Sequence, residues 1–397
     1  MQRILTLMIG LLVALPVNSQ GLREALDQAW ECHPVASASA ALEAEAQARV
    51  DLATGLTPAP AAFSISSVDD RLSQNRGKQS VELEFAVPLW LPGQKSAREA
   101  EARNSAQEVS ARRDALRLQV AGELREAWWA VADARNAHRQ AERRLALLLQ
   151  IEQEMLRRLQ AGDISRLEAN LAQSERLAVE AELGELGATL RLAEQNYRDL
   201  TGQAAPALLG EERAVTGLAP ADDHPLLRSV AASAALAHSK LRLADETRRE
   251  APTLAVRAFR DRADHVEPAA NTLGLKLTIP FSSAPRVQQD HAAALAEVTQ
   301  ADGEVARARL KLQRGAERAR LDLGAAQRQL ALTRQRRELI ADNLKLTEKA
   351  HALGESDLPA LLRVRLTMVE TEAALGRQQV AVAASQSKLN QVLGVLP

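Results

Sequence analysis

Apolar residues recur at helical spacing over most of this chain. Between Ala130 and Leu159, small and apolar residues step by threes and fours, which is the pattern of a coiled-coil seam. A second stripe that includes Leu124 and Trp128 lies on another side of the same segment, so this helix can pack against neighbours on both sides. The whole pattern predicts helices at residues 22–55, 93–160, 165–201, 225–250, 285–353 and 358–396.

The lengths of these segments suggest how the helices are arranged. At 1.5 Å per residue, segments 93–160 and 285–353 would each form a helix of roughly 100 Å. Segments 22–55 and 165–201 would reach roughly 50 and 55 Å, and stacked end to end they match one long helix. We therefore expect one continuous and one broken strut of equal height in each half of the chain.

Four short segments alternate between apolar and polar residues instead, and they predict strands at 60–68, 79–89, 252–261 and 271–281. Runs of about ten residues with one apolar and one polar face are typical of outer-membrane barrels. A half-buried hairpin of a soluble protein shows the same alternation. If the strands lie in lipid, Trp90 would sit at the water–lipid boundary. The residues expected to face the membrane are Val81, Leu83, Phe85, Val87, Leu273, Leu275, Leu277 and Ile279.

The order of these elements repeats along the chain. Pro280 follows Pro88 by 192 residues, and the pairs Gly162/Gly354 and Gly202/Gly394 are separated by the same interval. Such self-similarity indicates a structural repeat. We expect two repeats, residues 20–202 and 224–397, each with a helix, a β-hairpin, a long helix and a further helix. Residues 203–223, which contain several Pro and Gly breakers, would link them.

Residues 1–19 have the plan of a secretory signal peptide. Arg3 precedes an apolar run of 12 residues from Ile4 to Leu15, and Pro16 ends that run. The run is too short to span a bilayer, which needs about 20 residues. A buried N-terminal helix is the alternative. The signal and the repeat together favour the membrane interpretation of the strands.

Composition narrows the function further. Fifty Lys and Arg residues balance 51 Asp and Glu residues, so no basic excess indicates a nucleic-acid partner. Only 2% of the residues are aromatic, which fits close-packed Ala- and Leu-rich helices. Cys32 is the only cysteine and cannot form an intramolecular disulfide.

No catalytic constellation is visible. The seven His residues are scattered, and none forms a helical pair with a carboxylate at zinc-site spacing. No phosphate-binding loop of the GxxxxGK type occurs. We therefore expect neither an enzyme nor a cofactor or resident metal.

Two turn-and-helix segments, 159–169 and 353–361, carry a resemblance to a known family. With the endings Leu200-Thr201-Gly202 and Val392-Leu393-Gly394 and the strand-ending prolines, the chain resembles the TolC-like outer-membrane efflux proteins. Residues 88–95 and 162–165 are similar to the branch that serves heavy-metal cation efflux.

The resemblance implies a mainly α fold with a small β part. Long antiparallel helices would form an α-barrel tunnel, and four strands per chain would contribute to a trimeric, twelve-stranded transmembrane β-barrel. Four strands alone cannot close a wide pore, whereas three chains supply twelve. The expected partners are two further copies, outer-membrane lipid, a periplasmic adaptor and an inner-membrane RND-type pump.

The expected function is a passive exit duct of a tripartite efflux system in a Gram-negative outer membrane, conducting substrates such as heavy-metal cations. An exit duct for type I protein secretion uses the same architecture. A periplasmic coiled-coil adaptor or scaffold would share the signal and the helices, but it would have no use for two lipid-facing hairpins.

The two turns would lie at the periplasmic tip, where the tunnel closes at rest and the adaptor engages. Charges there are either solvated helix ends or a set that latches the tunnel shut, since weak exposed pairs suit a reversible gate. The predicted tip residues are Gly162, Asp163, Ser165, Arg166, Glu168, Gly354, Glu355, Asp357, Arg363 and Arg365.

Overall fold

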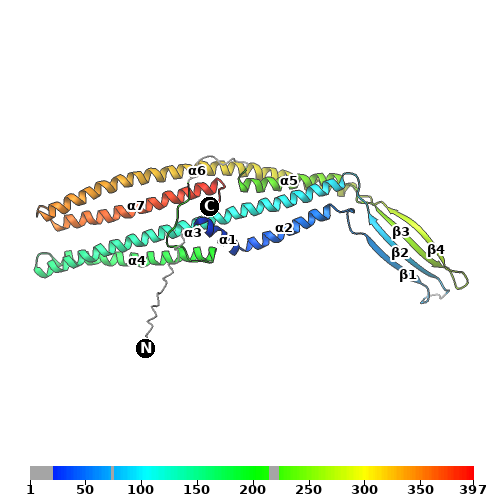
Figure 1. Cartoon of the computed structure of the whole chain (residues 1–397), viewed down its shortest axis with the longest axis horizontal. Coiled ribbons are helices and arrows are strands. Elements are labelled where there is room, and N and C mark those ends of the chain that lie inside the picture. Colours follow the sequence, from blue (N-terminus) through cyan, green and yellow to red (C-terminus); the bar gives the residue numbers. More distant parts are fainter. Residues whose placement is uncertain (1–20, 73–75, 214–222) are drawn as a thin grey trace, which may run out of the picture.

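The chain folds into a long body with a sheet at one end and two helical turns at the other (Figure 1). A computed structural model describes residues 21–72, 76–213 and 223–397. The predicted signal peptide and residues 214–222 of the predicted linker lie outside these ranges. The helices are α1 (Leu22–Cys32), α2 (Pro34–Ala53), α3 (Gln94–Ala161), α4 (Arg166–Thr201), α5 (Pro225–Glu246), α6 (Ala284–Ala352) and α7 (Leu358–Val392), and the strands are β1 (Ala62–Asp69), β2 (Gln79–Pro88), β3 (Thr253–Arg262) and β4 (Ala270–Thr278).

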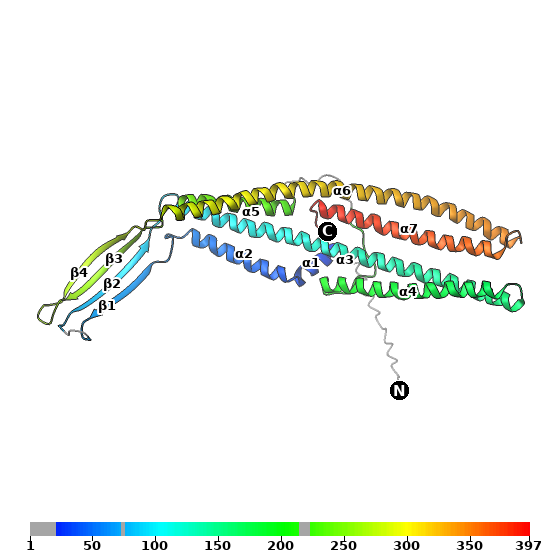
Figure 2. The ribbon, with the colours of Figure 1, turned by 180° about the vertical axis from the view of Figure 1, so that it is seen from behind.

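The helices form an open layer rather than a closed bundle. Towards the turns the packing order is α4, α3, α7 and α6, and towards the sheet it is α2, α3, α5 and α6. Both views show α3 and α6 running the whole length of the helical part, with the shorter helices beside them (Figures 1 and 2). The layer has one edge formed by α2 and α4, and another formed by α6.

The first predicted helix, 22–55, is wrong as one continuous element. The helix breaks at His33, whose backbone is extended with φ −76° and ψ 126°. Pro34 cannot donate a helical hydrogen bond, so it begins a new helix, and His33 Nδ1 caps that helix by accepting from Val35 N at 3.2 Å. The last predicted helix is also too long, because α7 ends at Val392, two residues before the left-handed Gly394.

The largest core lies in the middle of the body, where α1 packs on α3 and α4. Trp128 and Tyr197 are fully buried there, with ring centroids 6.0 Å apart. Leu22, Leu26 and Leu124 surround them. The few aromatic residues of this chain thus include two that hold α4 and α1 against α3.

Segment 203–213 is fastened to this core by buried polar contacts. Arg125 of α3 forms a bidentate ion pair with Glu212, with Nη2–Oε1 at 2.7 Å and Nε–Oε2 at 3.0 Å. The same guanidinium donates to the Val395 carbonyl at 2.9 Å, and Trp128 Nε1 donates to the Gly210 carbonyl at 3.3 Å. These contacts tie the segment and the C-terminus to one face of the layer.

The four strands form one antiparallel sheet in the order β1-β2-β3-β4. β2 and β3 join the two hairpins, with Phe85 opposite Val256 and Val87 opposite Leu254. Each outer strand keeps one unpaired edge within the described chain. Over the described ranges, no helix has the apolar length needed to span a bilayer.

Candidate functional site

The sheet presents one apolar face. Cross-strand partners project to the same side of an antiparallel sheet, so the register sorts the side chains. Phe63, Phe85, Val256 and Leu275 lie in one row across all four strands. Phe63 is 63% exposed and Leu275 is 76% exposed, because none of the described helices covers this face. The apolar residues on this face are Phe63, Ile65, Val81, Leu83, Phe85, Val87, Leu254, Val256, Ala258, Leu273, Leu275 and Leu277.

The opposite face carries charges that neutralise one another. The Arg257 guanidinium of β3 lies between Glu82 and Glu84 of β2, with Nε 3.1 Å from Glu84 Oε2. Lys276 Nζ of β4 reaches the same Glu84 oxygen at 3.4 Å. Arg257 also stacks on the Phe259 ring, 4.5 Å from its centroid. Such a face suits water and the first face suits an apolar medium.

The strand exits depart in part from the predicted strand ends. Ile279 and Phe281 follow the last residue of β4, so they lie beyond the sheet at its junction with α6. Both are exposed. Trp90 follows β2 and donates from Nε1 to the Gly55 carbonyl at 3.3 Å, which ties the sheet exit to the end of α2. Trp90 thus makes an ordinary contact between the hairpin and the end of a helix, which a residue at a water–lipid boundary does not need.

The turn between α3 and α4 is built from two complementary caps. Gly162 has φ +81°, and its N–H and that of Asp163 donate to the carbonyls of Leu159 and Arg158, which is a Schellman motif. Ser165 then starts α4 with a capping box, in which Glu168 N donates to Ser165 Oγ and Ser165 N donates to Glu168 Oε2. The hydrogen bonds from the backbone and hydroxyl of Ser165 lower the pKa of the Glu168 carboxyl.

The turn between α6 and α7 also combines a left-handed glycine with a side-chain cap, but it has no capping box. Gly354 has φ +77°, and Glu355 N donates to the Ala350 carbonyl at 2.9 Å. Asp357 Oδ1 caps α7 by accepting from Ala360 N at 2.9 Å. Figure 1 places both turns at the end of the body opposite the sheet. The structure thus brings the two sets of predicted tip residues to one end.

The charges at this end form local contacts within each hairpin. Arg365 of α7 pairs with Glu348 of α6 at 3.0 Å. Among the described residues, Asp163, Arg166, Glu355 and Arg363 have no ion-pair partner. Their side chains are therefore available to other molecules.

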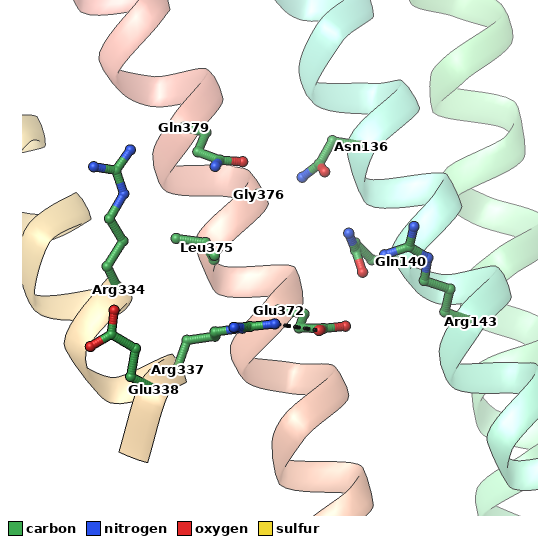
Figure 3. Close-up of a pocket in the computed structure, with 10 residues that line it drawn as sticks. All are labelled: Asn136, Gln140, Arg143, Arg334, Arg337, Glu338, Glu372, Leu375, Gly376 and Gln379. Carbon is green, nitrogen blue, oxygen red and sulfur yellow. Dashed lines mark ion pairs between the residues drawn. The ribbon is translucent and has the colours of Figure 1, made fainter. Parts of the chain in front are cut away.

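Two features of the structure were not predicted. The Arg125–Glu212 pair joins residues 87 positions apart. The only sequence signal near Glu212 was the set of Pro and Gly residues that predicted a linking segment. A polar pocket between α3, α6 and α7 combines residues from three helices (Figure 3). Within the part of the chain that the structure describes, no three His, Cys, Asp or Glu side chains gather closely enough to hold a metal ion.

Comparison with known proteins gives fold-level matches. No family model and no curated protein sequence matches this chain. The structure of CusC, described for folding and transmembrane channel formation, aligns with a TM-score of 0.76 and 13% identity over 94% of this chain and 92% of that chain. The CmeC outer membrane channel of Campylobacter jejuni gives 0.73 and 13% over 94% and 85%. The outer membrane protein VceC of Vibrio cholerae gives 0.73 and 16% over 94% and 96%. The chain therefore has the predicted TolC-like fold of long helices and a small sheet.

Proposed function

We propose that this chain is the outer-membrane exit duct of a tripartite efflux system, belonging to the TolC-like family. Three copies would close a twelve-stranded barrel in the outer membrane and continue it as a helical tunnel in the periplasm. Transport through the duct would be passive, without enzymatic activity. Matches to outer-membrane channels along nearly the whole chain support this proposal.

The two-faced sheet is the observation that carries the proposal. Its apolar face is uncovered, with Phe85 50% exposed and Leu273 76% exposed. An exposed apolar area of this kind marks a site that contacts protein or membrane. The ion pairs of Arg257 and Lys276 on the opposite face require water or a polar lumen. A periplasmic scaffold would leave the apolar face without a function.

Both the sheet and the helical layer are open at two edges, and these edges predict how copies meet. In a ring, β4 of one copy would pair with β1 of the next, and α6 would lie beside α2 and α4 of the next. Contacts of this head-to-tail kind close into rings. Ring closure also removes unpaired strand edges, which cannot exist in lipid.

The outer sides of α4 and α6 both carry exposed apolar residues, and their net charges are opposite. On α4, the side facing away from α3 carries an exposed seam that includes Leu177, Ala181, Ala188 and Leu192. On α6, exposed Leu residues recur at intervals of 11 and 7 at positions 310, 321, 332, 339 and 346, and Leu353 directly after the helix continues the series. Residues 333–350 of α6 and residues 168–185 of α4 lie at similar distances from the turns; the α6 stretch contains five basic and three acidic residues, and the α4 stretch contains one basic and five acidic residues. Opposite charges beside matching seams favour an α6–α4 contact between copies.

In this proposal the turns at Gly162 and Gly354 meet the periplasmic adaptor, and an RND-type pump supplies the energy. The unpaired charges of Asp163, Arg166, Glu355 and Arg363 are available for that contact or for a latch between copies. The candidate cargo is a heavy-metal cation, on the resemblance of residues 88–95 and 162–165. Type I protein secretion remains the alternative use of the same duct.

The test places charge on each face of the sheet. Leu83→Arg and Leu275→Arg should abolish heat-modifiable trimers in outer-membrane fractions, since arginine on a lipid-facing strand costs up to about 2–4 kcal/mol. Ser66→Arg, on the opposite face of β1, is the matched control and should leave trimers intact. Purified wild-type trimers should also conduct ions in planar bilayers. Equal tolerance of all three variants, or a soluble monomer, would refute the proposal.

A further inference from the structure

A pocket of about 370 Å³ lies where α3, α6 and α7 meet (Figure 3). It is separated from the turn at Gly354 by about 18 residues of helix, or roughly 27 Å. Residues of segment 207–211 line a second pocket, and this second pocket has Asn136, Gly376 and Gln379 in common with the first. The pocket therefore opens on the same face of the layer as this segment. The α6 residues that line it, Arg334, Arg337 and Glu338, lie on the side of that edge helix that faces α7, so a neighbouring copy packed on the outer side of α6 would leave the pocket accessible.

The floor of the pocket contains polar atoms without partners. Asn136 is only 6% exposed, and its Nδ2 has no hydrogen-bond acceptor. The nearby Gln140 Oε1 is also buried without a donor. A buried polar atom that lacks a partner costs about 1–3 kcal/mol. Figure 3 shows the Asn136 amide pointing from α3 towards α7, where a ligand can accept its hydrogen.

The charged residues of the pocket are three arginines, Arg143, Arg334 and Arg337, and two glutamates, Glu338 and Glu372. Arg143 of α3 and Arg334 of α6 are exposed and, among the described residues, neither has an ion-pair partner. Arg337 has only a long contact to Glu372, at 3.8 Å. Guanidinium groups that are free in this way favour carboxylate ligands, because their fork of donors matches two oxygens.

The pocket crosses α7 at its glycine. A Cβ at Gly376 would lie 2.5 Å from Asn136 Oδ1, so the absence of a side chain lets α7 approach α3. Figure 3 shows Arg143 on one side of α7 and Arg334 on the other. A single small anion cannot contact both guanidinium groups across a helix about 10 Å wide.

From these contacts we infer that the pocket binds an acidic polypeptide segment of a partner protein, which crosses α7 at Gly376 and places one carboxylate near Arg143 and Asn136 and another near Arg334. This contact is separate from the tip contact and does not depend on conduction through the duct.

Binding of a fluorescein-labelled, N-acetylated hexaglutamate peptide to the purified full chain in detergent tests this inference by fluorescence anisotropy. The double variant Arg143→Gln/Arg334→Gln should weaken binding at least tenfold. Arg307→Gln/Arg336→Gln is the matched control, because it removes the same charge outside the pocket, and it should change binding less than twofold. A benzophenone-bearing version of the peptide should crosslink next to Gly376 or Gln379.

Equal losses in both double variants would show attraction by the general basic field of α6 and would overturn the inference, as would absence of binding. A second experiment uses glutarate as a competitor of the labelled peptide. If glutarate displaces the peptide at the same concentration as hexaglutamate itself, with the same arginine dependence, the pocket is a small-anion site and the polypeptide assignment is wrong.

Discussion

Removing one partner of the Arg125–Glu212 pair should release segment 203–213 from the body. The side chains of this pair are 4% and 8% exposed, so both charges are almost completely removed from water. Glu212→Ala would leave the Arg125 guanidinium buried, with the side-chain oxygen Oε1 of Gln391 and the backbone carbonyl of Val395 as its remaining acceptors. An uncompensated buried charge of this kind is strongly unfavourable.

The expected cost is about 3–5 kcal/mol, the range for breaking a buried ion pair. At 1.4 kcal/mol per factor of ten, the equilibrium for local opening of the segment would rise by roughly two to three and a half powers of ten. Exposed pairs provide the contrast. The side chains of Arg117 and Asp27 are 40% and 55% exposed, and such a pair contributes only about 0–1 kcal/mol.

Trypsin cleavage after Arg213 measures this opening directly, because the Arg213 carbonyl is held by Asn390 Nδ2 at 3.1 Å in the closed state. Glu212→Ala should be cleaved there at least a hundredfold faster than the wild type under native conditions. Asp27→Asn, the control at the exposed pair, should be cleaved at the wild-type rate within about fivefold.

A double replacement separates the buried charge from simple loss of contact. Arg125→Met/Glu212→Leu removes both charges and should restore most of the protection, because apolar replacements of a buried pair are often neutral. If Glu212→Ala is cleaved no faster than Asp27→Asn, or if the double variant is cleaved as fast as Glu212→Ala, the reasoning from desolvation is refuted.

Three further predictions concern the turns and the helix joints. Gly162→Ala should destabilise the fold by about 1–2 kcal/mol, because φ is +81° at this position. Gly184→Ala should stabilise the fold by up to about 1 kcal/mol, because Gly184 lies inside α4 with open space around it. The midpoints of thermal unfolding of the two variants should move in opposite directions. Ser165→Ala should cost about 1 kcal/mol through the lost cap. The lowered pKa of Glu168 contributes stability that is present above the ordinary pKa of 4.5 and is lost as pH falls through the folded pKa. Ser165→Ala should therefore lose less stability than the wild type between pH 6 and pH 3. Equal losses of stability in acid would contradict this account. Burial lowers the pKa of His224, so the unfolded chain binds more protons below its ordinary value of 6.5 and wild-type stability should fall as pH drops from there towards the folded pKa. His224→Gln should remove that decline between pH 8 and pH 5, while His238→Gln, at an exposed site, should keep it.

The sequence predicted the elements whose signal is local. Long runs at helical spacing and alternating strands depend on neighbouring residues, and the turns at Gly162 and Gly354 follow from glycine at a left-handed position. The break at His33 was missed because the apolar pattern continues through it. Its signal was present in the His33-Pro34 pair, whose equivalent at His224-Pro225 begins α5.

The third strand and the pocket show where local patterns fail. In β3, Phe259 lies on the charged face under Arg257, so residue type alone assigns it to the wrong side. The cross-strand register, which depends on pairing with β2, corrects it. The pocket at Gly376 combines residues from α3, α6 and α7, and the Arg125–Glu212 pair joins α3 to the linking segment. Neither arrangement has a signal at a fixed spacing in the sequence.

The two joints between short helices explain how the body leaves its edges free. At one joint, a Cβ on Gly202 would lie 3.3 Å from Cys32 Sγ, so the end of α4 abuts the end of α1. At the other, a Cβ on Gly394 would lie 2.7 Å from the His224 ring, so the end of α7 abuts the start of α5. The chain crosses from its first half to its second half near these joints. Arg125 holds segment 203–213 and the C-terminus there, on one face of the layer. Within the part of the chain that the structure describes, both edges of the layer and the opposite face remain uncovered, as the proposed closure of identical copies around an open lumen requires.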